Sequence, residues 1–193
     1  MIKEPNDFII ACDMDDTIEQ FGSAWINWLN SHYGTTVTPE QVTSWNIASY
    51  FPEIPKAEIY SCTESEAFWD SVEPDSHAIF YLSKLQDEGF PIYIVTSAHH
   101  KTYAAKLEKC LFKYFPFIDR HNVIVTYNKQ LIKCNVLVDD GTHNIEGDYY
   151  GLLMSRPHNQ SYIVDNDKTY RVNNWTEVYH KIHELYNMQK NCI

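Results

Sequence analysis

The chain has 193 residues, of which 44% are hydrophobic and 15% aromatic, and it carries a formal net charge of −11. This length and composition suit one domain with a sizeable core, or a core with a small inserted cap, and argue against a disordered chain. The negative charge argues against a nucleic-acid polymer or an anionic membrane as the main partner, because both need a positive field.

The cysteines and the apolar segments bear on the compartment. No stretch approaches the roughly 20 apolar residues of a membrane span, and the first seven residues are polar, unlike a secretory signal. The cysteines form an odd, scattered set without a C-x-x-C pair: Cys12, Cys62, Cys110, Cys134 and Cys192. We therefore expect free thiols in a reducing compartment, and hence a cytoplasmic protein with no membrane partner.

Short apolar runs rich in Ile, Val and Tyr recur along the chain, and little alternation is visible in them, which is typical of strands buried on both faces of a parallel sheet. The expected strands are Phe8–Cys12, Pro91–Thr96, Asn122–Thr126, Asn135–Val138 and Ser161–Val164. Helical patterns are found at Ser76–Glu88, Ala98–Tyr114 and Asn174–Asn187. This order predicts an α/β fold with a doubly wound, Rossmann-like parallel sheet, in which ligands bind beyond the carboxyl ends of the strands.

The stretch between Thr17 and Ser76 breaks the alternation, because it contains several helix signals and no expected strand. One helical stripe ends at Gly34, and Thr38-Pro39-Glu40-Gln41 reads as a capping box with proline at the first helical position. A small helical cap inserted after the first strand is the economical explanation. The expected division is an α/β core of residues 1–17 and 75–193 and a helical cap of residues 18–74.

Four polar groups each follow an expected strand at its C-terminal end. They are Asp13 with Asp15, Thr96 with Ser97, Lys129, and Asp139 with Asp140. Residues two apart on an extended chain share a side, so Asp13 and Asp15 can serve one site. Asp139 and Asp140 would repel each other without a cation. Each group alone is commonplace, but together they indicate a site for a divalent cation and an attacking oxygen.

In this order the four groups resemble the signatures of the haloacid-dehalogenase-like phosphatases. The resemblance implies that Asp13 attacks phosphorus to form an aspartyl-phosphate, and that Asp15 acts as general acid and then as general base. It also implies a Mg²⁺ ion held by the Asp13 carboxylate, the Asp15 backbone carbonyl and Asp140. Asp139 would support Asp140 without binding the ion directly.

The same resemblance assigns the phosphate group to three residues. Thr96, together with Ser97 and a helix N-terminus near Ser97-Ala98, would hold phosphate oxygens through hydroxyl and backbone N–H groups. Lys129 would lie against both the nucleophile and the phosphate, where a cation holds like charges together.

A narrower resemblance, to the 5′(3′)-deoxyribonucleotidase branch of this superfamily, runs nearly end to end. The run Asp13-Met14-Asp15-Asp16-Thr17 is followed by Phe21, where the branch has a base-stacking phenylalanine. Trp45 and Phe68 are the further cap aromatics that this resemblance places near the nucleoside. The segments Lys129–Asp140, His158–Gln160 and Arg171–Trp175 also echo the branch. Its members often form dimers, so the resemblance makes a homodimer one possible assembly and leaves the oligomeric state open.

The expected function is therefore Mg²⁺-dependent hydrolysis of (deoxy)ribonucleoside monophosphates to nucleoside and phosphate. One alternative keeps the chemistry and changes the substrate to a sugar phosphate or another small phosphomonoester. A second alternative is a non-enzymatic phosphoacceptor domain of the receiver type, although receivers place the acidic pair on their first strand. Ala98-His99-His100 replaces the proline that vertebrate members have after this Thr-Ser pair, and base and sugar preference stay open.

Overall fold

The computed structural model describes residues 4–191, and its centre is a sheet of six parallel strands. The strands are β1 (Ile10–Cys12), β2 (Ile92–Thr96), β3 (Val123–Val125), β4 (Val136–Asp139), β5 (Tyr150–Met154) and β6 (Thr169–Val172). Their order across the sheet is β3-β2-β1-β4-β5-β6, which confirms the predicted parallel α/β architecture. The two central strands, β1 and β4, are buried along their whole length.

The strands differ from the prediction at one edge of the sheet. The predicted strand at Ser161–Val164 is wrong, because this segment is a loop in which Ile163 is 81% exposed. β5 and β6 form the edge instead. β5 lacks β-branched residues, so its sequence gave no strand signal, and its pairing with β4 along the whole strand makes it one. Cys192, for which we expect a free thiol, lies outside the described residues.

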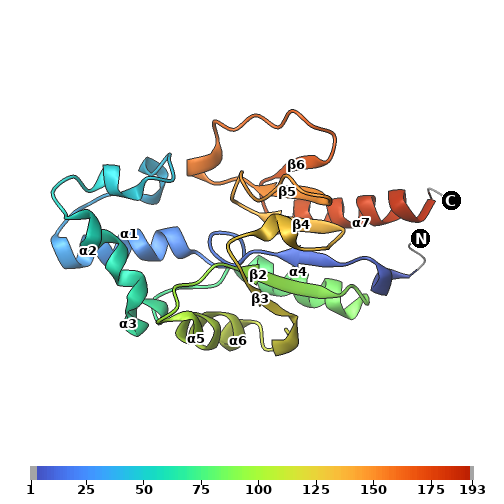
Figure 1. The fold of residues 1–193 in the computed structure, drawn as a ribbon, viewed down its shortest axis with the longest axis horizontal. Helices are drawn as coiled ribbons and strands as arrows, with labels where there is room; N and C mark the ends of the chain where they lie inside the picture. Colours follow the sequence, from blue (N-terminus) through green and yellow to red (C-terminus); the bar gives the residue numbers. More distant parts are fainter. Residues whose placement is uncertain (1–3, 192–193) are drawn as a thin grey trace.

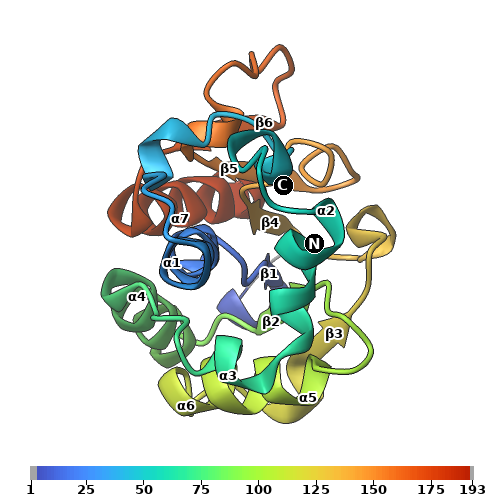
Figure 2. The same cartoon turned by 90° about the vertical axis from the view of Figure 1, so that its left-hand side faces the viewer.

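The helices of the core pack against one face of the sheet (Figure 2). They are α4 (Ser76–Asp87), α5 (Tyr103–Lys106), the π-helical turn Leu107–Leu111, α6 (Phe112–Tyr114) and α7 (Trp175–Asn191). Ile10, Ile94 and Val136 point from the strands into the core that these helices cover. Ala11 and Val95, one residue further along their strands, point to the opposite face, where a smaller cluster lies under the connecting segments.

α7 ties the C-terminal part of the chain to the segment after β1. Its buried stripe includes Trp175, Val178 and Ile182, and the Trp175 indole N–H donates to the Thr17 backbone oxygen at 3.0 Å. The opposite face of α7 is polar. Within residues 4–191, no helix is both long enough and apolar enough to cross a bilayer.

Residues 18–74, called the cap segment below, lie beyond the carboxyl ends of the strands (Figure 1). They contain α1 (Phe21–Tyr33), α2 (Lys56–Ser61), α3 (Glu66–Trp69) and several 3₁₀ turns. Gly34, with φ of 69°, ends α1 in the left-handed conformation that glycine adopts without strain. The capping box at Thr38 forms, but it begins a single 3₁₀ turn rather than a longer helix. The division into core and cap stays a prediction.

Candidate active site

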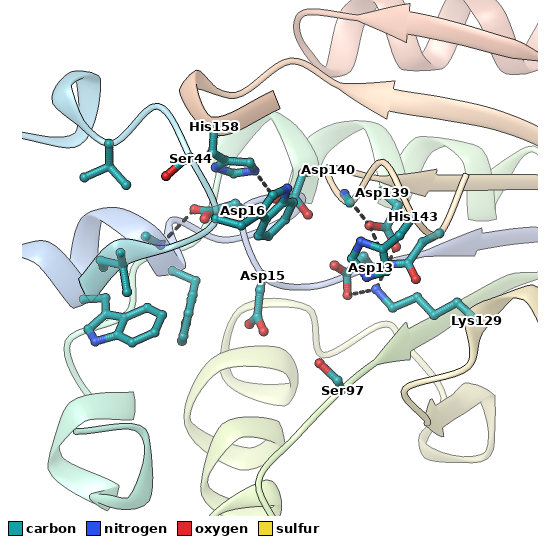
Figure 3. A pocket seen from close by; sticks show the side chains of 18 of the residues that line it. Asp13, Asp15, Asp16, Ser44, Ser97, Lys129, Asp139, Asp140, His143 and His158 are labelled. Atoms are coloured by element: carbon teal, nitrogen blue, oxygen red, sulfur yellow. Dashed lines mark hydrogen bonds and ion pairs between the residues drawn. The ribbon is translucent and has the colours of Figure 1, made fainter. Parts of the chain in front are cut away.

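The acidic residues meet where the direction of the chain across the sheet reverses. β1 and β4 are neighbours, and the chain continues from β1 to β2 on one side and from β4 to β5 on the other. In open parallel sheets this reversal opens a crevice at the carboxyl ends of the strands. Asp13 follows β1 and its N–H donates to the Val138 oxygen at 2.9 Å, while Asp139 ends β4. Figure 3 shows Asp13, Asp139 and Asp140 gathered at this point.

Lys129 joins the two acidic segments. It begins a 3₁₀ turn after β3, and its Nζ lies 2.6 Å from Asp13 Oδ1 and 2.7 Å from Asp139 Oδ2. Burial alone would lower the pKa of Lys129, but the charges of Asp13 and Asp139 outweigh it and raise the pKa above its ordinary value. Lys129 is thus a fixed cation between two anions.

The carboxylates around this lysine outnumber it. Burial, followed by the charge of Asp139, raises the pKa of Asp13 to about 7, although Lys129 opposes the shift. Burial and the charges of nearby acids also raise the pKa of Asp140 well above its ordinary value. Asp13, Asp139 and Asp140 each offer a carboxylate oxygen, and these oxygens lie within 4.8 Å of one another. A buried oxygen cluster with excess negative charge fits a hard divalent cation such as Mg²⁺.

Asp139 and Asp140 differ in how their oxygens are engaged. Besides its ion pair through Oδ2, Asp139 accepts hydrogen bonds at Oδ1 from the Gly141 N–H at 2.7 Å and from Asn144 Nδ2 at 3.2 Å. Asp140 Oδ2 lies 2.8 Å from His158 Nε2, and its Oδ1 makes no hydrogen bond within the described part of the chain. Asp140 therefore has a carboxylate oxygen to offer an ion, whereas both oxygens of Asp139 are engaged.

The side chain of Asp15 is paired with a second buried lysine, Lys106. Lys106 Nζ lies 2.7 Å from Asp15 Oδ2 and donates to Thr96 Oγ1 and to the Ser97 backbone oxygen, both at 2.9 Å. Figure 3 shows Asp15 set apart from Asp13, on the side toward the cap segment. The acid predicted to exchange the proton and the residue predicted to attack phosphorus thus lie at different places along one cavity.

The segment after β2 differs from its prediction. Ser97 lines the cavity, whereas Thr96 is fully buried and its hydroxyl donates to the Ser97 oxygen at 3.2 Å. The predicted helix start near Ser97-Ala98 is wrong, because α5 begins at Tyr103. The intervening residues form a turn that contacts the cap segment, where the Thr102 hydroxyl donates to the Thr63 oxygen at 2.6 Å.

The site opens into a cavity of about 210 Å³ between the strand ends and the cap segment. Phe21 and Trp45, both predicted to contact substrate, line it. Phe68 does not, because it is fully buried and its ring packs edge-on against Phe21 at 5.6 Å between centroids. Trp45 reaches from the cap segment to the core, where its ring lies 4.2 Å from that of His158 and 5.9 Å from that of His143.

Comparison with known proteins identifies the family. A family model described as 5′ nucleotidase, deoxy (Pyrimidine), cytosolic type C matches residues 7–189. The chain belongs to this family. It is 30% identical over 179 residues to a 5′(3′)-deoxyribonucleotidase of Bacillus subtilis, covering 90% of this chain and 98% of that protein. A 5′(3′)-deoxyribonucleotidase of Clostridium acetobutylicum is 29% identical over 171 residues, covering 87% and 91%.

Solved structures share the fold of this nucleotidase at low identity. A HAD family hydrolase of Deinococcus radiodurans, described with bound phosphate and sodium, has a TM-score of 0.61 at 14% identity, covering 92% of this chain and 95% of that one. A HAD hydrolase of Bacillus subtilis, described as bound to magnesium, has a TM-score of 0.56 at 16% identity, covering 91% and 98%. The fold is therefore that of the haloacid-dehalogenase-like hydrolases.

Several residues of this nucleotidase lie in the site without having been predicted there. Asp16, with φ of 52°, accepts a hydrogen bond from the Gly22 N–H at 2.9 Å, and burial raises its pKa to about 6. Asp16, Asp140 and His158 form a second group whose ligand atoms lie within 4.8 Å of one another. Asp16 and His158 could have been predicted, because both fall in segments that resemble the motifs of the family. Lys106 could not have been predicted, because a lysine in a helical pattern is usually a solvent-exposed charge.

Proposed function

We propose that the protein is a Mg²⁺-dependent phosphatase that hydrolyses deoxyribonucleoside monophosphates to nucleoside and phosphate through an aspartyl-phosphate on Asp13. Membership of this family makes the chain a nucleotide phosphatase of the haloacid-dehalogenase-like superfamily. The observation that carries the proposal is the meeting of the Asp13, Asp139 and Asp140 carboxylates at the reversal point of the sheet. Lys129 pairs with Asp13 and Asp139, and aromatic residues line part of the cavity above the site.

The residues fit a magnesium ion. The Asp13 carboxylate, the Asp15 backbone carbonyl and Asp140 Oδ1 would hold it, and Asp139 would remain with Lys129. When bound, the ion neutralises charge on the phosphoryl oxygens. The excess of buried carboxylates over cations at this point supports the assignment.

In the first half of the reaction, an Asp13 carboxylate oxygen attacks phosphorus in line with the leaving oxygen. The Asp13 O–P bond forms as the bond from phosphorus to the sugar oxygen breaks, and the sugar oxygen takes the bonding electrons and a proton from Asp15. In the second half, water attacks phosphorus and gives its proton to the Asp15 carboxylate. The bond between Asp13 and phosphorus then breaks, which restores the Asp13 carboxylate and releases phosphate.

Ser97 and Lys129 would hold the phosphate oxygens. Both line the cavity, and Lys129 already contacts the nucleophile. Thr96 would contribute indirectly, because its buried hydroxyl lies behind Ser97 and binds Lys106. A serine hydroxyl and an ammonium supply the donors that a phosphate dianion requires.

The aromatic part of the cavity would receive the nucleoside. Phe21 and Trp45 offer ring faces on which a base can stack, and base–aromatic stacking contributes about 1–3 kcal/mol. Phe68 would act by supporting Phe21 from behind rather than by touching substrate. The similarity to proteins named 5′(3′)-deoxyribonucleotidases supports a deoxyribonucleoside 5′- or 3′-monophosphate, rather than a sugar phosphate, as the substrate of this chain.

We also propose a domain division, a compartment, a partner class and an assembly for this activity. Cap residues 18–74 would close over the core formed by residues 1–17 and 75–193. We place the protein in the cytoplasm, which the free, buried state of the four described cysteines supports. The net charge of −11 supports a small nucleotide rather than a nucleic-acid polymer as partner. A homodimer is the proposed assembly, and sedimentation equilibrium tests it.

A phosphate-release assay tests the substrate class. The purified protein is assayed with Mg²⁺ against deoxy- and ribonucleoside 5′- and 3′-monophosphates and against a panel of sugar phosphates, with EDTA as the matched control. We expect turnover of deoxyribonucleoside monophosphates that EDTA abolishes. A sugar phosphate preferred by about 100-fold, equivalent to about 2.8 kcal/mol, would overturn the nucleotidase proposal while keeping the phosphatase chemistry.

A further inference from the structure

Lys106 is a buried cation that the mechanism above leaves without a role. Its side chain is 1% exposed, and a buried ammonium is costly unless it is paired and hydrogen-bonded. All of its three N–H donors have acceptors: Asp15 Oδ2 at 2.7 Å, and Thr96 Oγ1 and the Ser97 oxygen at 2.9 Å. Every one of these acceptors belongs to a strand-end segment of the active site.

The local structure fixes where this ammonium can lie. Lys106 ends α5, and the chain changes to a π-helical turn at Leu107, a feature that is frequent at functional sites. The ammonium also lies 5.4 Å from the centroid of the Trp69 ring in the cap segment. With its stem buried and its head bounded by an aromatic ring and three acceptors, Lys106 has little freedom to move.

The two carboxylate oxygens of Asp15 have different surroundings. Oδ2 is held by Lys106, whereas Oδ1 is buried and has no hydrogen-bond partner among residues 4–191. Asp15 lines the cavity on the side of Asp13 that faces the cap segment (Figure 3). That is the side on which a nucleoside leaving group would lie if its phosphate were at Asp13. Oδ1 is enclosed by protein, and the buried Glu19 interacts with the Asp15 carboxyl. The Asp15 side chain is nevertheless 27% exposed, so Lys106 holds in one orientation a carboxyl that still opens to the cavity.

We propose that Lys106 is the positioning residue of Asp15: it fixes the carboxyl beside the leaving oxygen and couples its orientation to the Thr96–Ser97 segment that holds the phosphate. This inference rests on the proposed function. It gives the two buried lysines different roles, because Lys129 contacts the nucleophile whereas Lys106 contacts the group that exchanges the proton.

The dependence of the rate on the leaving group tests this role. Deoxyuridine 5′-monophosphate has a basic leaving oxygen that needs a proton, whereas the 4-nitrophenolate of 4-nitrophenyl phosphate leaves without one. For Lys106→Met we expect kcat for the nucleotide to fall about 100-fold, within the range that general acid–base catalysis contributes. The first turnover of 4-nitrophenyl phosphate should keep its rate and give a stoichiometric burst of 4-nitrophenolate. Later turnovers should slow, because Asp15 must then accept a proton from water.

Matched variants separate this role from a structural one. Lys109→Met removes a lysine on the same helical segment that pairs with Asp70 in the cap segment, and it should leave both rates unchanged. Lys106→Arg keeps the charge and should restore part of the nucleotide rate. Equal slowing of the first turnover with both esters, together with a raised KM, would make Lys106 a phosphate-binding cation and overturn the proposal. Unchanged rates with both esters would also overturn it.

A double variant keeps the test valid if Lys106→Met fails to fold. Asp15→Asn with Lys106→Met removes both charges of the pair, which is far less destabilising than leaving one of them buried and alone. If Lys106 acts through Asp15, this double variant and Asp15→Asn should turn over 4-nitrophenyl phosphate at rates within about twofold of each other. A further loss of tenfold or more would contradict the proposal. A wild-type protein that hydrolyses neither ester would instead refute the proposed function itself.

Discussion

Asp140 is hydrogen-bonded to a histidine, whereas Asp139 is paired with a lysine. His158 Nε2 lies 2.8 Å from Asp140 Oδ2, and burial lowers the pKa of His158 to about 4. A neutral imidazole can donate one hydrogen bond to the carboxylate without neutralising it. His158 therefore orients Asp140 while leaving its charge for an ion, which is the usual role of residues that support metal ligands.

This arrangement makes a prediction for His158→Ala. Loss of the hydrogen bond should let Asp140 rotate, and the Mg²⁺ concentration that gives half-maximal activity should rise about tenfold or more. A Mg²⁺ titration of nucleotide hydrolysis measures it. Gln160→Ala, which changes an exposed neighbour bonded to the Arg156 oxygen, is the control. An unchanged Mg²⁺ requirement in His158→Ala would show that Asp140 needs no such support.

At the scale of elements, the sequence predicted the strands that carry the chemistry better than the edge formed by β5 and β6. The runs that became β1, β2, β3 and β4 are rich in Ile and Val, and their ends position Asp13 and Asp139. β5 contains Gly151 and two leucines, and its strand structure depends on pairing with β4, which no local pattern reveals. Local propensity thus found β1 to β4 and missed β5, whose strand structure depends on tertiary contacts.

The same limit applies to the side chains of the site. Asp13, Asp139 and Lys129 could be predicted because each follows a strand whose carboxyl end points into the crevice. Phe68 and Trp45 could not be told apart, because both are aromatic residues in a helical stretch. Their roles depend on which side of the cap segment faces the cavity, and only the packing of that segment decides it.

Substitution of these two aromatics should therefore give opposite results. Trp45 is 52% exposed and lines the cavity, so Trp45→Ala should raise KM for deoxyuridine 5′-monophosphate about tenfold with little change in Tm. Phe68→Leu should lower the free energy of unfolding by about 1 kcal/mol or more while KM stays close to that of the wild type. Steady-state kinetics and thermal unfolding of both variants measure the contrast. A raised KM in Phe68→Leu without loss of stability would mean that Phe68 contacts substrate.

For the whole molecule, the buried carboxylates link stability to pH and to magnesium. The pKa of Asp13 is raised from 3.8 to about 7 and that of Asp16 to about 6, with burial as the main cause. In the folded protein without an ion, these groups hold protons that the unfolded chain has already released. Their contribution to stability therefore falls as the pH rises from about 4 to about 7 and is constant above that range.

Magnesium should reverse this loss, because it binds the deprotonated carboxylates. We expect the Mg²⁺-induced rise in Tm to be larger at about pH 7.5 than at about pH 5.5, since the affinity should fall about tenfold for each pH unit below 7. Differential scanning calorimetry with Mg²⁺ or EDTA at matched ionic strength measures it. An equal rise at both pH values would contradict the assignment of Asp13 as a magnesium ligand with a raised pKa.

The central claim is that Asp13 carries the phosphoryl group between the two halves of the reaction. The direct measurement is to quench the enzyme during turnover of a deoxyribonucleoside monophosphate, reduce it with borohydride and sequence its peptides by mass spectrometry. Borohydride converts an aspartyl-phosphate to homoserine, so homoserine should appear at position 13 when substrate and Mg²⁺ are both present, and not in EDTA. Homoserine at another position, or none while the enzyme turns over, would contradict the account.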